Sequence, residues 1–333
     1  MKAAPQRLLN VLRSREMGIL LALLLVVVAA TIKNPGFLFS KDGWHDLLIT
    51  PSILLVVAVG QAIVIITRNV DLSVGSMLGL TAYLVGTVFV KFPTIPWQLV
   101  FVIGIGFGAL LGLINGALVG YGRVPAMVIT LGTLYAYRGI NVAWTGSNRI
   151  NADQIPMGLQ SMGNNSILGI PILTIIALVV LIIAAWYMRT IRSGREMYAI
   201  GSDPEAAELY GLAKRRRVIT AFVVSGAMSG LAGVMYTARY ATINSQAGDG
   251  FELDAIGAAV IGGVAIVGGS GTVVGAAIGA FLLYTINRAL PVISIPDFWQ
   301  KAVVGALILG AIVLDRVLAV RQSRKLSQGK EAK

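Results

Sequence analysis

Three polar residues that could hydrogen-bond a ligand follow directly after a long apolar run. Asn69, Asp71 and Ser73 occur in the stretch TRNVDLSVGS, and Ser76 follows about one helical turn later. An amide, a carboxylate and hydroxyls supply the donors and acceptors that orient a polar ligand in a mostly apolar surround. If this segment interrupts a membrane helix, freed N–H groups and Asp71 would face ligand hydroxyls deep in the bilayer. The alternative is structural, with Asp71 as the N-cap of the next helix, and the sequence leaves both open.

A second polar group lies in the apolar stretch 125–144. Arg138 is the strongest candidate there, with Tyr135 and Tyr137 beside it and Thr130 and Thr133 one or two turns earlier. Polar groups inside a membrane are costly, so they are candidates for function by default. The alternative is that Arg138 extends to lipid headgroups at an interface. Asn115 either faces the same pathway or bonds a neighbouring helix, and we favour the second interpretation.

The sequence offers little material for a catalytic or metal site. It contains one histidine, His45, and no cysteine, whereas metal sites and nucleophile–base pairs need clusters of such residues. We therefore expect no enzyme activity, no cofactor and no metal. An ion-coupled secondary transporter would need buried titratable groups. Acidic residues are nearly absent from the apolar runs, so that function is the weaker alternative.

A short polar segment in the middle of the chain has the marks of a helix with defined ends. In GSDPEAAELYG, Asp203 can cap the first turn and Pro204 can occupy the first helical position. An alternative cap pairs Ser202 with Glu205, and Gly211 suits the left-handed residue after the last turn. A helix of about seven residues does not persist alone in water. The segment therefore either docks into a partner or lies on lipid headgroups.

These polar segments are set in a strongly apolar chain. It has 56% hydrophobic and 13% charged residues and a mean hydropathy of +0.80, whereas an average soluble domain has about 25% charged residues. Repeated apolar runs can each cross a hydrocarbon core of roughly 30 Å, so we expect an all-α, polytopic helical membrane bundle of about ten spans. The expected spans are 17–32, 48–67, 72–90, 97–119, 125–144, 170–188, 218–238, 253–267, 272–289 and 298–318. The segment 253–289 could instead hold one span and a re-entrant loop.

The basic residues predict the orientation of this bundle. With the N-terminus inside, about 19 of the 27 Lys and Arg residues fall on inner segments, as the positive-inside rule requires. Both termini are then cytoplasmic. The expected organisation is a basic N-terminus 1–16, a membrane domain 17–318 with a cytoplasmic loop 189–217, and a basic tail 319–333. Topology explains the formal charge of +12, so we expect no binding to nucleic acid.

Glycines recur at every fourth residue in two of the apolar runs. The rows are Gly104, Gly108, Gly112, Gly116 and Gly120, and then Gly271, Gly275 and Gly279. Small residues at this spacing let helix backbones approach closely inside a membrane. Both rows predict tight packing within the bundle.

Four stretches of the chain resemble the permeases of ABC importers of the ribose and branched-chain amino acid type. They are TRNVDLSVGSMLGL (67–80), VPAMVITLGTLYAYRGI (124–140), GREMYAIGSDPEAAELYGL (194–212) and GAAVIGGVAIVGGSGTVVGAAIGAFLL (257–283), in the order of that family. The sugar branch usually has Gly-Gly-Ile-Asp-Leu-Ser in the first stretch. The RNVDLS found here is similar to autoinducer-2 and rhamnose permeases instead.

This resemblance implies import of a monosaccharide or sugar-like solute, such as rhamnose or autoinducer-2, across the bacterial cytoplasmic (inner) membrane. Two permease chains, identical or related, would form the pathway within the membrane lipid, ABC ATPase subunits would drive it, and an extracytoplasmic solute-binding protein would deliver the solute. The chain has no Walker A motif, so ATP hydrolysis would occur on a partner. The resemblance assigns ATPase coupling to segment 201–212, with Gly201, Ser202, Asp203, Pro204, Glu205, Ala206, Ala207 and Gly211. Asp249, Glu252 and Asp254 are expected in an outer loop, as docking charges or as ordinary solvated charge.

Overall fold

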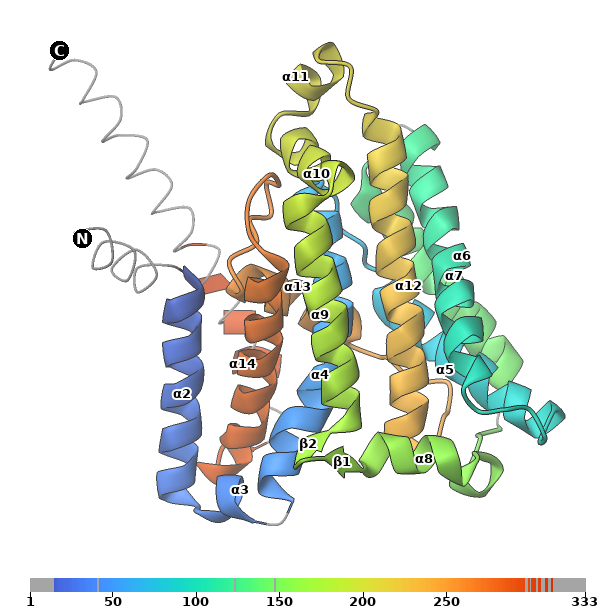
Figure 1. The fold of residues 1–333 in the computed structure, drawn as a ribbon, viewed down its shortest axis with the longest axis vertical. Helices are drawn as coiled ribbons and strands as arrows, with labels where there is room; N and C mark the ends of the chain where they lie inside the picture. The colour runs from blue at the N-terminus through green and yellow to red at the C-terminus, as the bar shows by residue number, and fades with distance from the viewer. Residues whose placement is uncertain are drawn as a thin grey trace, which may run out of the picture.

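The computed structural model describes residues 15–40, 42–122, 124–146 and 148–296, and a few positions between 299 and 313. Most of the expected N-terminus 1–16, most of the tenth span 298–318, and the tail 319–333 lie outside the described residues. Within them the chain is a bundle of mostly aligned helices (Figure 1). The long helices are α2 (Arg15–Lys33), α4 (Gly43–Ile66), α5 (Val74–Lys91), α6 (Leu99–Gly122), α7 (Ala126–Thr145), α9 (Ile172–Thr190), α12 (Lys214–Tyr240) and α14 (Val273–Val292).

Short elements mark the two ends of the bundle. α10 (Arg192–Ser202) and α11 (Pro204–Leu209) lie at one end, which we call the α11 end (Figure 1). The opposite end, called the α8 end, carries α3 (Gly36–Phe39), α8 (Met157–Asn164) and the antiparallel pair β1 (Ser166–Ile167) and β2 (Ile170–Pro171). A 3-10 turn, Ala152–Gln154, precedes α8.

Seven helices among the described residues are long and apolar enough to cross a membrane. They are α2, α4, α5, α6, α9, α12 and α14, and they coincide with seven of the ten expected spans. α7 has 20 residues but is more polar and falls outside this set.

The expected span 253–267 is replaced by a short helix and a loop. Helix α13 (Phe251–Ile261) has 11 residues, or about 16 Å at 1.5 Å per residue, which is too short to cross alone. The chain leaves the helix because Gly263, Gly268, Gly269 and Gly271 all adopt positive φ, a conformation that glycine tolerates best.

Helix α4 forms the centre of the bundle, and every residue from Pro51 to Ile66 is buried. It packs against α12, α14, α13 and α9. By contrast, α2 lies at the edge of the bundle against α14 and leaves Leu21, Leu25 and Ile32 exposed. An apolar exposed surface of this kind is suited to lipid.

The glycine rows lie where helices approach most closely, as predicted. A Cβ added at Gly108 of α6 would lie 2.2 Å from the carbonyl oxygen of Gly226 in α12, and one at Gly226 would lie 2.3 Å from the carbonyl oxygen of Gly108. In the second row, a Cβ at Gly275 or Gly279 of α14 would lie 2.1 Å from a backbone oxygen of Gly262 or of Ala258. These distances confirm the prediction of tight packing for both rows.

Candidate functional site

Two helices begin at the same point inside the bundle. A Cβ added at Gly75, in the first turn of α5, would lie 2.1 Å from Oε2 of Glu252, in the first turn of α13. From there α5 runs to the α8 end, and α13 runs to the α11 end, where Gly269 donates to the carbonyl of Ile66 at 3.0 Å. We call this meeting point the junction. It brings two positive helix N-termini together, as discontinuous helices do around polar ligands.

The junction corrects the position expected for the acidic residues after α12. Glu252 and Asp254 belong to the first turn of α13 and not to an outer loop, while Asp249 lies on the connection that precedes it. Oε2 of Glu252 is buried and has no hydrogen-bond partner among the described residues. This carboxylate is therefore partly buried at the junction, at a position just outside the expected apolar runs.

Asp71 lies beside the junction and is fully buried. Its Oδ1 accepts from the backbone N–H of Ser73 at 2.9 Å and from the Ser73 hydroxyl at 2.7 Å. Its Oδ2 has no partner in the described part of the chain. The helix N-cap position of α5 is occupied by Ser73 and not by Asp71, so Asp71 instead closes a tight side-chain turn ahead of the helix.

A hydrogen-bond network holds this broken segment in place. Asn115 of α6 donates to the Ser73 hydroxyl at 2.7 Å and accepts from Tyr137 of α7 at 3.2 Å. Thr130 donates to the carbonyl of Val70 at 3.2 Å. Asn115 thus bonds two neighbouring segments, which was the favoured interpretation of this residue.

Gln61 anchors the same segment from α4. With its amide oriented to satisfy both groups, Gln61 donates to the carbonyl of Asp71 at 3.1 Å and accepts from its N–H at 3.3 Å. The sequence analysis did not select Gln61, and it expected Glu252 only in an outer loop, whereas Tyr137 was already placed beside Arg138. A lone amide in an otherwise apolar run was the one available signal for Gln61.

Arg138 has partners within the chain and does not extend to headgroups. Its guanidinium forms an ion pair with Asp249 at 2.8 Å and donates to the carbonyl of Ala247 at 2.8 Å. It therefore fastens α7 to the connection 241–250 that leads into the junction. Of the remaining expected pathway residues, Tyr135 is 69% exposed, Thr133 donates to the carbonyl of Thr130, and Asn69 donates to the carbonyl of Thr67.

A polar cavity of about 350 Å³ lies between α13 and α14, next to the junction. Its lining residues are Leu54, Asp249, Phe251, Asp254, Tyr284, Asn287 and Arg288. Oδ1 of Asn287 is buried and unpartnered among the described residues. Buried polar atoms normally have partners, so a hydroxylated ligand or water would complete this wall.

At the α11 end, helix α11 projects from the bundle (Figure 1). Asp203 caps it by accepting from the N–H groups of Glu205 at 3.1 Å and Ala206 at 3.0 Å, and Pro204 occupies its first turn. This confirms Asp203 over the alternative Ser202–Glu205 cap. The helix ends as expected, with Gly211 at a φ of +75°.

The exposed residues of α11 and of its C-terminal cap include both acidic and large apolar side chains, with Glu205 and Glu208 in the first group. Leu209 and Tyr210 are 89% and 86% exposed, whereas Ala207 is buried within the chain. Gly201 is buried too, because a Cβ there would lie 1.8 Å from the carbonyl oxygen of Ile66. Of the residues expected at a docking surface, Gly201 and Ala207 therefore face the chain itself.

Helix α10 ties α11 firmly to the bundle. Glu196 accepts from Arg217 of α12 and from Arg192 at 2.7 Å, and these two hydrogen bonds hold the pKa of Glu196 below its ordinary value. Tyr198 donates to the carbonyl of Gly271, just before α14, at 3.0 Å. A displacement of α11 would therefore pass directly to α4, α12 and α14.

The comparisons with known proteins agree with this architecture. The family described as "Branched-chain amino acid transport system / permease component" matches residues 44–312. The chain is 37% identical over 306 residues to the autoinducer 2 import system permease protein LsrC of Enterobacter sp. (strain 638), covering 92% of this chain and 88% of that protein. It is 34% identical over 324 residues to the protein of the same name from Shigella flexneri, covering 96% and 92%. No solved structure matches the chain.

These matches confirm the family expected from the four sequence stretches and its similarity to autoinducer-2 permeases. The family matched is one of transport components, not of enzymes. The chain belongs to the branched-chain amino acid transport system permease family, and it is a multi-pass transport subunit of the bacterial inner membrane.

Proposed function

We propose that this chain is the permease subunit of an ABC importer for autoinducer 2 or a closely related sugar-like solute. The names of its relatives support the substrate class. The observation that carries the mechanism is the capped helix α11, which exposes Leu209 and Tyr210 at its end and is attached to the bundle through α10. An isolated helix of 6 residues is unstable in water, and its exposed Leu209 and Tyr210 suit a groove in an ATPase subunit.

In this proposal, ATP-driven closure of the ATPase subunits moves α11 as a rigid body. Glu196 transmits the motion to α12 through Arg217, and Tyr198 transmits it to the start of α14 through the carbonyl of Gly271. Since α14 lines the cavity next to the junction, movement at the α11 end would change the shape of that cavity. Gly201 and Ala207 would act by close packing inside the chain, not by touching the partner.

The solute would pass the junction and its adjoining cavity. Unpartnered oxygens of Asp71, Glu252 and Asn287 would accept hydrogen bonds from solute hydroxyls, and Phe251 and Tyr284 would supply aromatic faces. Asp71 and Ser73 from the expected pathway set belong to this region, with Asn115 and Thr130 positioning them. Such a site needs only weak affinity if a binding protein delivers the solute.

The assembly would contain a second permease chain, two ATPase subunits and an extracytoplasmic binding protein. We propose that the chain crosses the membrane ten times, with the connection 241–250 and α13 together forming one crossing and with both termini in the cytoplasm, which puts the α11 end inside and the α8 end outside. The binding protein would then meet the α8 end. Lipid would cover the exposed apolar sides of helices such as α2.

The test is ATP-dependent uptake by vesicles that contain this chain, its companion permease and the ATPase subunits. Leu209→Ala with Tyr210→Ala should abolish uptake and release the ATPase during purification, because most of the apolar docking surface is lost. Leu25→Ala, at an exposed position of α2 (68%), is the matched control and should behave as wild type. Full uptake by the double variant would refute docking on α11.

A second experiment distinguishes this function from ion-coupled transport. Ion-coupled transport is the competing function because Asp71 and one carboxylate oxygen of Glu252 are buried inside the bundle. Vesicles are given either ATP or a proton or sodium gradient, with labelled autoinducer 2 carried by its binding protein. Uptake with the gradient and without ATPase subunits would overturn the proposal.

A further inference from the structure

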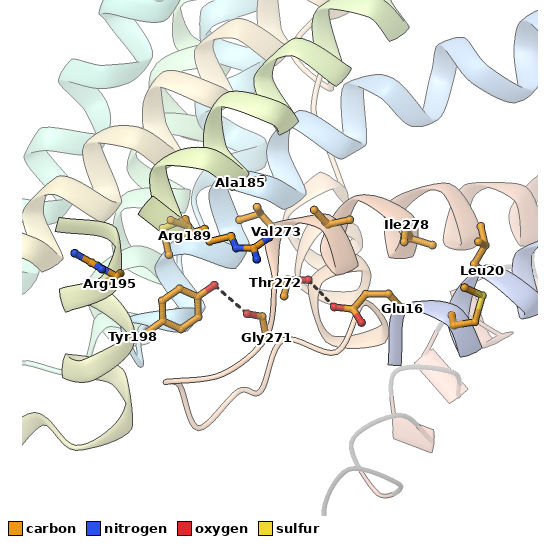
Figure 2. A pocket seen from close by; sticks show the side chains of 13 residues that line it. Glu16, Leu20, Ala185, Arg189, Arg195, Tyr198, Gly271, Thr272, Val273 and Ile278 are labelled. Carbon is orange, nitrogen blue, oxygen red and sulfur yellow. Dashed lines mark hydrogen bonds between the residues drawn. The ribbon is translucent and has the colours of Figure 1, made fainter. Parts of the chain in front are cut away.

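A cavity of about 760 Å³ lies between α2, α9, α10 and α14 (Figure 2), and its lining shares no residue with the cavity beside the junction. α2 and α9 each pack on α14 and leave this space between them. Its apolar wall consists of Met17, Leu20, Ala185, Met188, Val273, Val274 and Ile278. Because α2, α9 and α14 are all candidate membrane spans, this wall continues into the bilayer from the α11 end.

The mouth of the cavity is positively charged. Arg189 lies in the last turn of α9, and Figure 2 shows its guanidinium extending toward Val273, at the start of α14. No ion pair involves Arg189 within the described residues, whereas Arg192 and Arg217 nearby both pair with Glu196. The N-terminus of α14, a helix of 20 residues, adds a positive helix end at the same place.

The acidic residue Glu16 also lines this mouth, but its position allows an anionic ligand to bind in the cavity. Glu16 accepts from the Thr272 hydroxyl at 3.1 Å, and Figure 2 shows it on the opposite side of Thr272 from Arg189. Arg195 also lines the cavity, but its guanidinium extends away from the space between α9 and α14 (Figure 2). Arg189 is therefore the cation available to a ligand in the cavity.

We propose that this cavity binds one anionic phospholipid. Its phosphate would bond Arg189 and the N–H groups of Val273 and Val274, since those of Gly275 and Ala276 already donate to Thr272. Its acyl chain would lie along Leu20, Val274 and Ile278. Val274 and Ile278 are one helical turn apart, about 6 Å along the axis, so the apolar wall extends below the headgroup position. Basic pockets between membrane helices bind anionic lipid headgroups in this way. A phospholipid fits this cavity better than inorganic phosphate does, because inorganic phosphate would leave the apolar wall uncovered.

The test uses the purified full chain in detergent, with lipid binding followed by native mass spectrometry and by the thermal unfolding midpoint. The probes are dioctanoyl phosphatidylglycerol, dioctanoyl phosphatidylcholine and inorganic phosphate. Phosphatidylglycerol should bind and raise the midpoint more than phosphatidylcholine, and phosphate should have no effect. Arg189→Gln should weaken phosphatidylglycerol binding about fivefold, because a basic residue near a charged lipid contributes roughly 1 kcal/mol to the binding free energy.

Two further variants make the result decisive. Arg216→Gln removes the same charge from an exposed position of α12 outside the cavity lining and should leave binding unchanged. Ile278→Trp fills the apolar wall and should remove the lipid adduct without lowering the midpoint measured in detergent alone. The proposal would be overturned by equal binding of both lipids, or by equal losses of phosphatidylglycerol binding in Arg189→Gln and Arg216→Gln. It would also be overturned if phosphate alone raised the unfolding midpoint, or if the lipid adduct survived Ile278→Trp.

Discussion

Replacing Gly108 by alanine should force α6 and α12 apart. The new Cβ would lie 2.2 Å from the carbonyl oxygen of Gly226 and 2.7 Å from the Cα of Gly230. A carbon and a carbonyl oxygen in ordinary contact are about 3.3 Å apart, so the two backbones must separate by roughly 1 Å. No side chain can rotate away to avoid this, because both contacts are with backbone atoms. We expect a loss of about 1–3 kcal/mol of stability, the usual range for overpacking.

The assay is the thermal unfolding midpoint in detergent, read by fluorescence-detected size exclusion. Gly106→Ala is a matched control on the same helix, since a Cβ at Gly106 meets nothing within 4 Å. Alanine is a better helix former than glycine by about 1 kcal/mol, so the control should be neutral or stabilising.

The converse substitution checks the geometry from the other helix. Gly226→Ala should cost as much as Gly108→Ala, since its Cβ would lie 2.3 Å from the carbonyl oxygen of Gly108. The double variant should cost less than the sum, because one separation relieves both contacts. Equal midpoints for the Gly108 and Gly106 variants would refute the close backbone contact.

Three further predictions concern orientation, the anchor of α10 and the junction. The chain has no cysteine, so a single introduced cysteine can be labelled alone, either at Leu168 at the α8 end or at Leu209 on α11, which are 98% and 89% exposed. In intact cells, a membrane-impermeant maleimide should label Leu168→Cys and not Leu209→Cys. The opposite labelling pattern would reverse the proposed topology. Glu196→Gln should lower the unfolding midpoint at pH 7, because the side chain no longer carries the charge that strengthens the hydrogen bonds from Arg192 and Arg217. Since Arg192 is 84% exposed and Arg217 only 18%, most of the loss, about 1.5–3 kcal/mol, should come from the bond to Arg217. Because the folded-state pKa of Glu196 is depressed, the wild-type advantage should persist above about pH 4.3 and fade as the pH drops through the folded pKa; a midpoint difference that does not depend on pH would contradict this. Asp71→Ala should destabilise the chain by about 1–3 kcal/mol through loss of both bonds to Ser73, whereas Asp71→Asn should fold normally and lower uptake; normal uptake by a folded Asp71→Asn variant would remove Asp71 from the pathway.

The two ends of helix α11 and the close packing at the glycine rows were predictable because both depend on residues that are near one another in the sequence. Asp203, Pro204 and Gly211 set the limits of α11 through their own hydrogen bonds and dihedral angles. The four-residue spacing of glycines in α6 needed no knowledge of the partner to predict close approach. Run length and hydropathy located the seven apolar helices for the same reason.

Contacts between distant segments were not predictable from residue types. Arg138 was expected either in a pathway or at headgroups, yet it pairs with Asp249, 111 positions later in the chain. Glu252 was expected in a loop, yet it packs against Gly75 of α5. Ala207 was expected at a partner surface, and it is buried within the chain.

The sequence by itself determined that this chain is a polytopic helical membrane protein with a capped helix outside the apolar runs, since hydropathy, glycine spacing and capping residues act over a few neighbouring positions. Only the tertiary structure decided that α5 and α13 begin together inside the bundle and that Asp71 and one carboxylate oxygen of Glu252 are buried there. The physical reason is that burial of a carboxylate depends on which distant helices enclose it, and no local pattern records that choice.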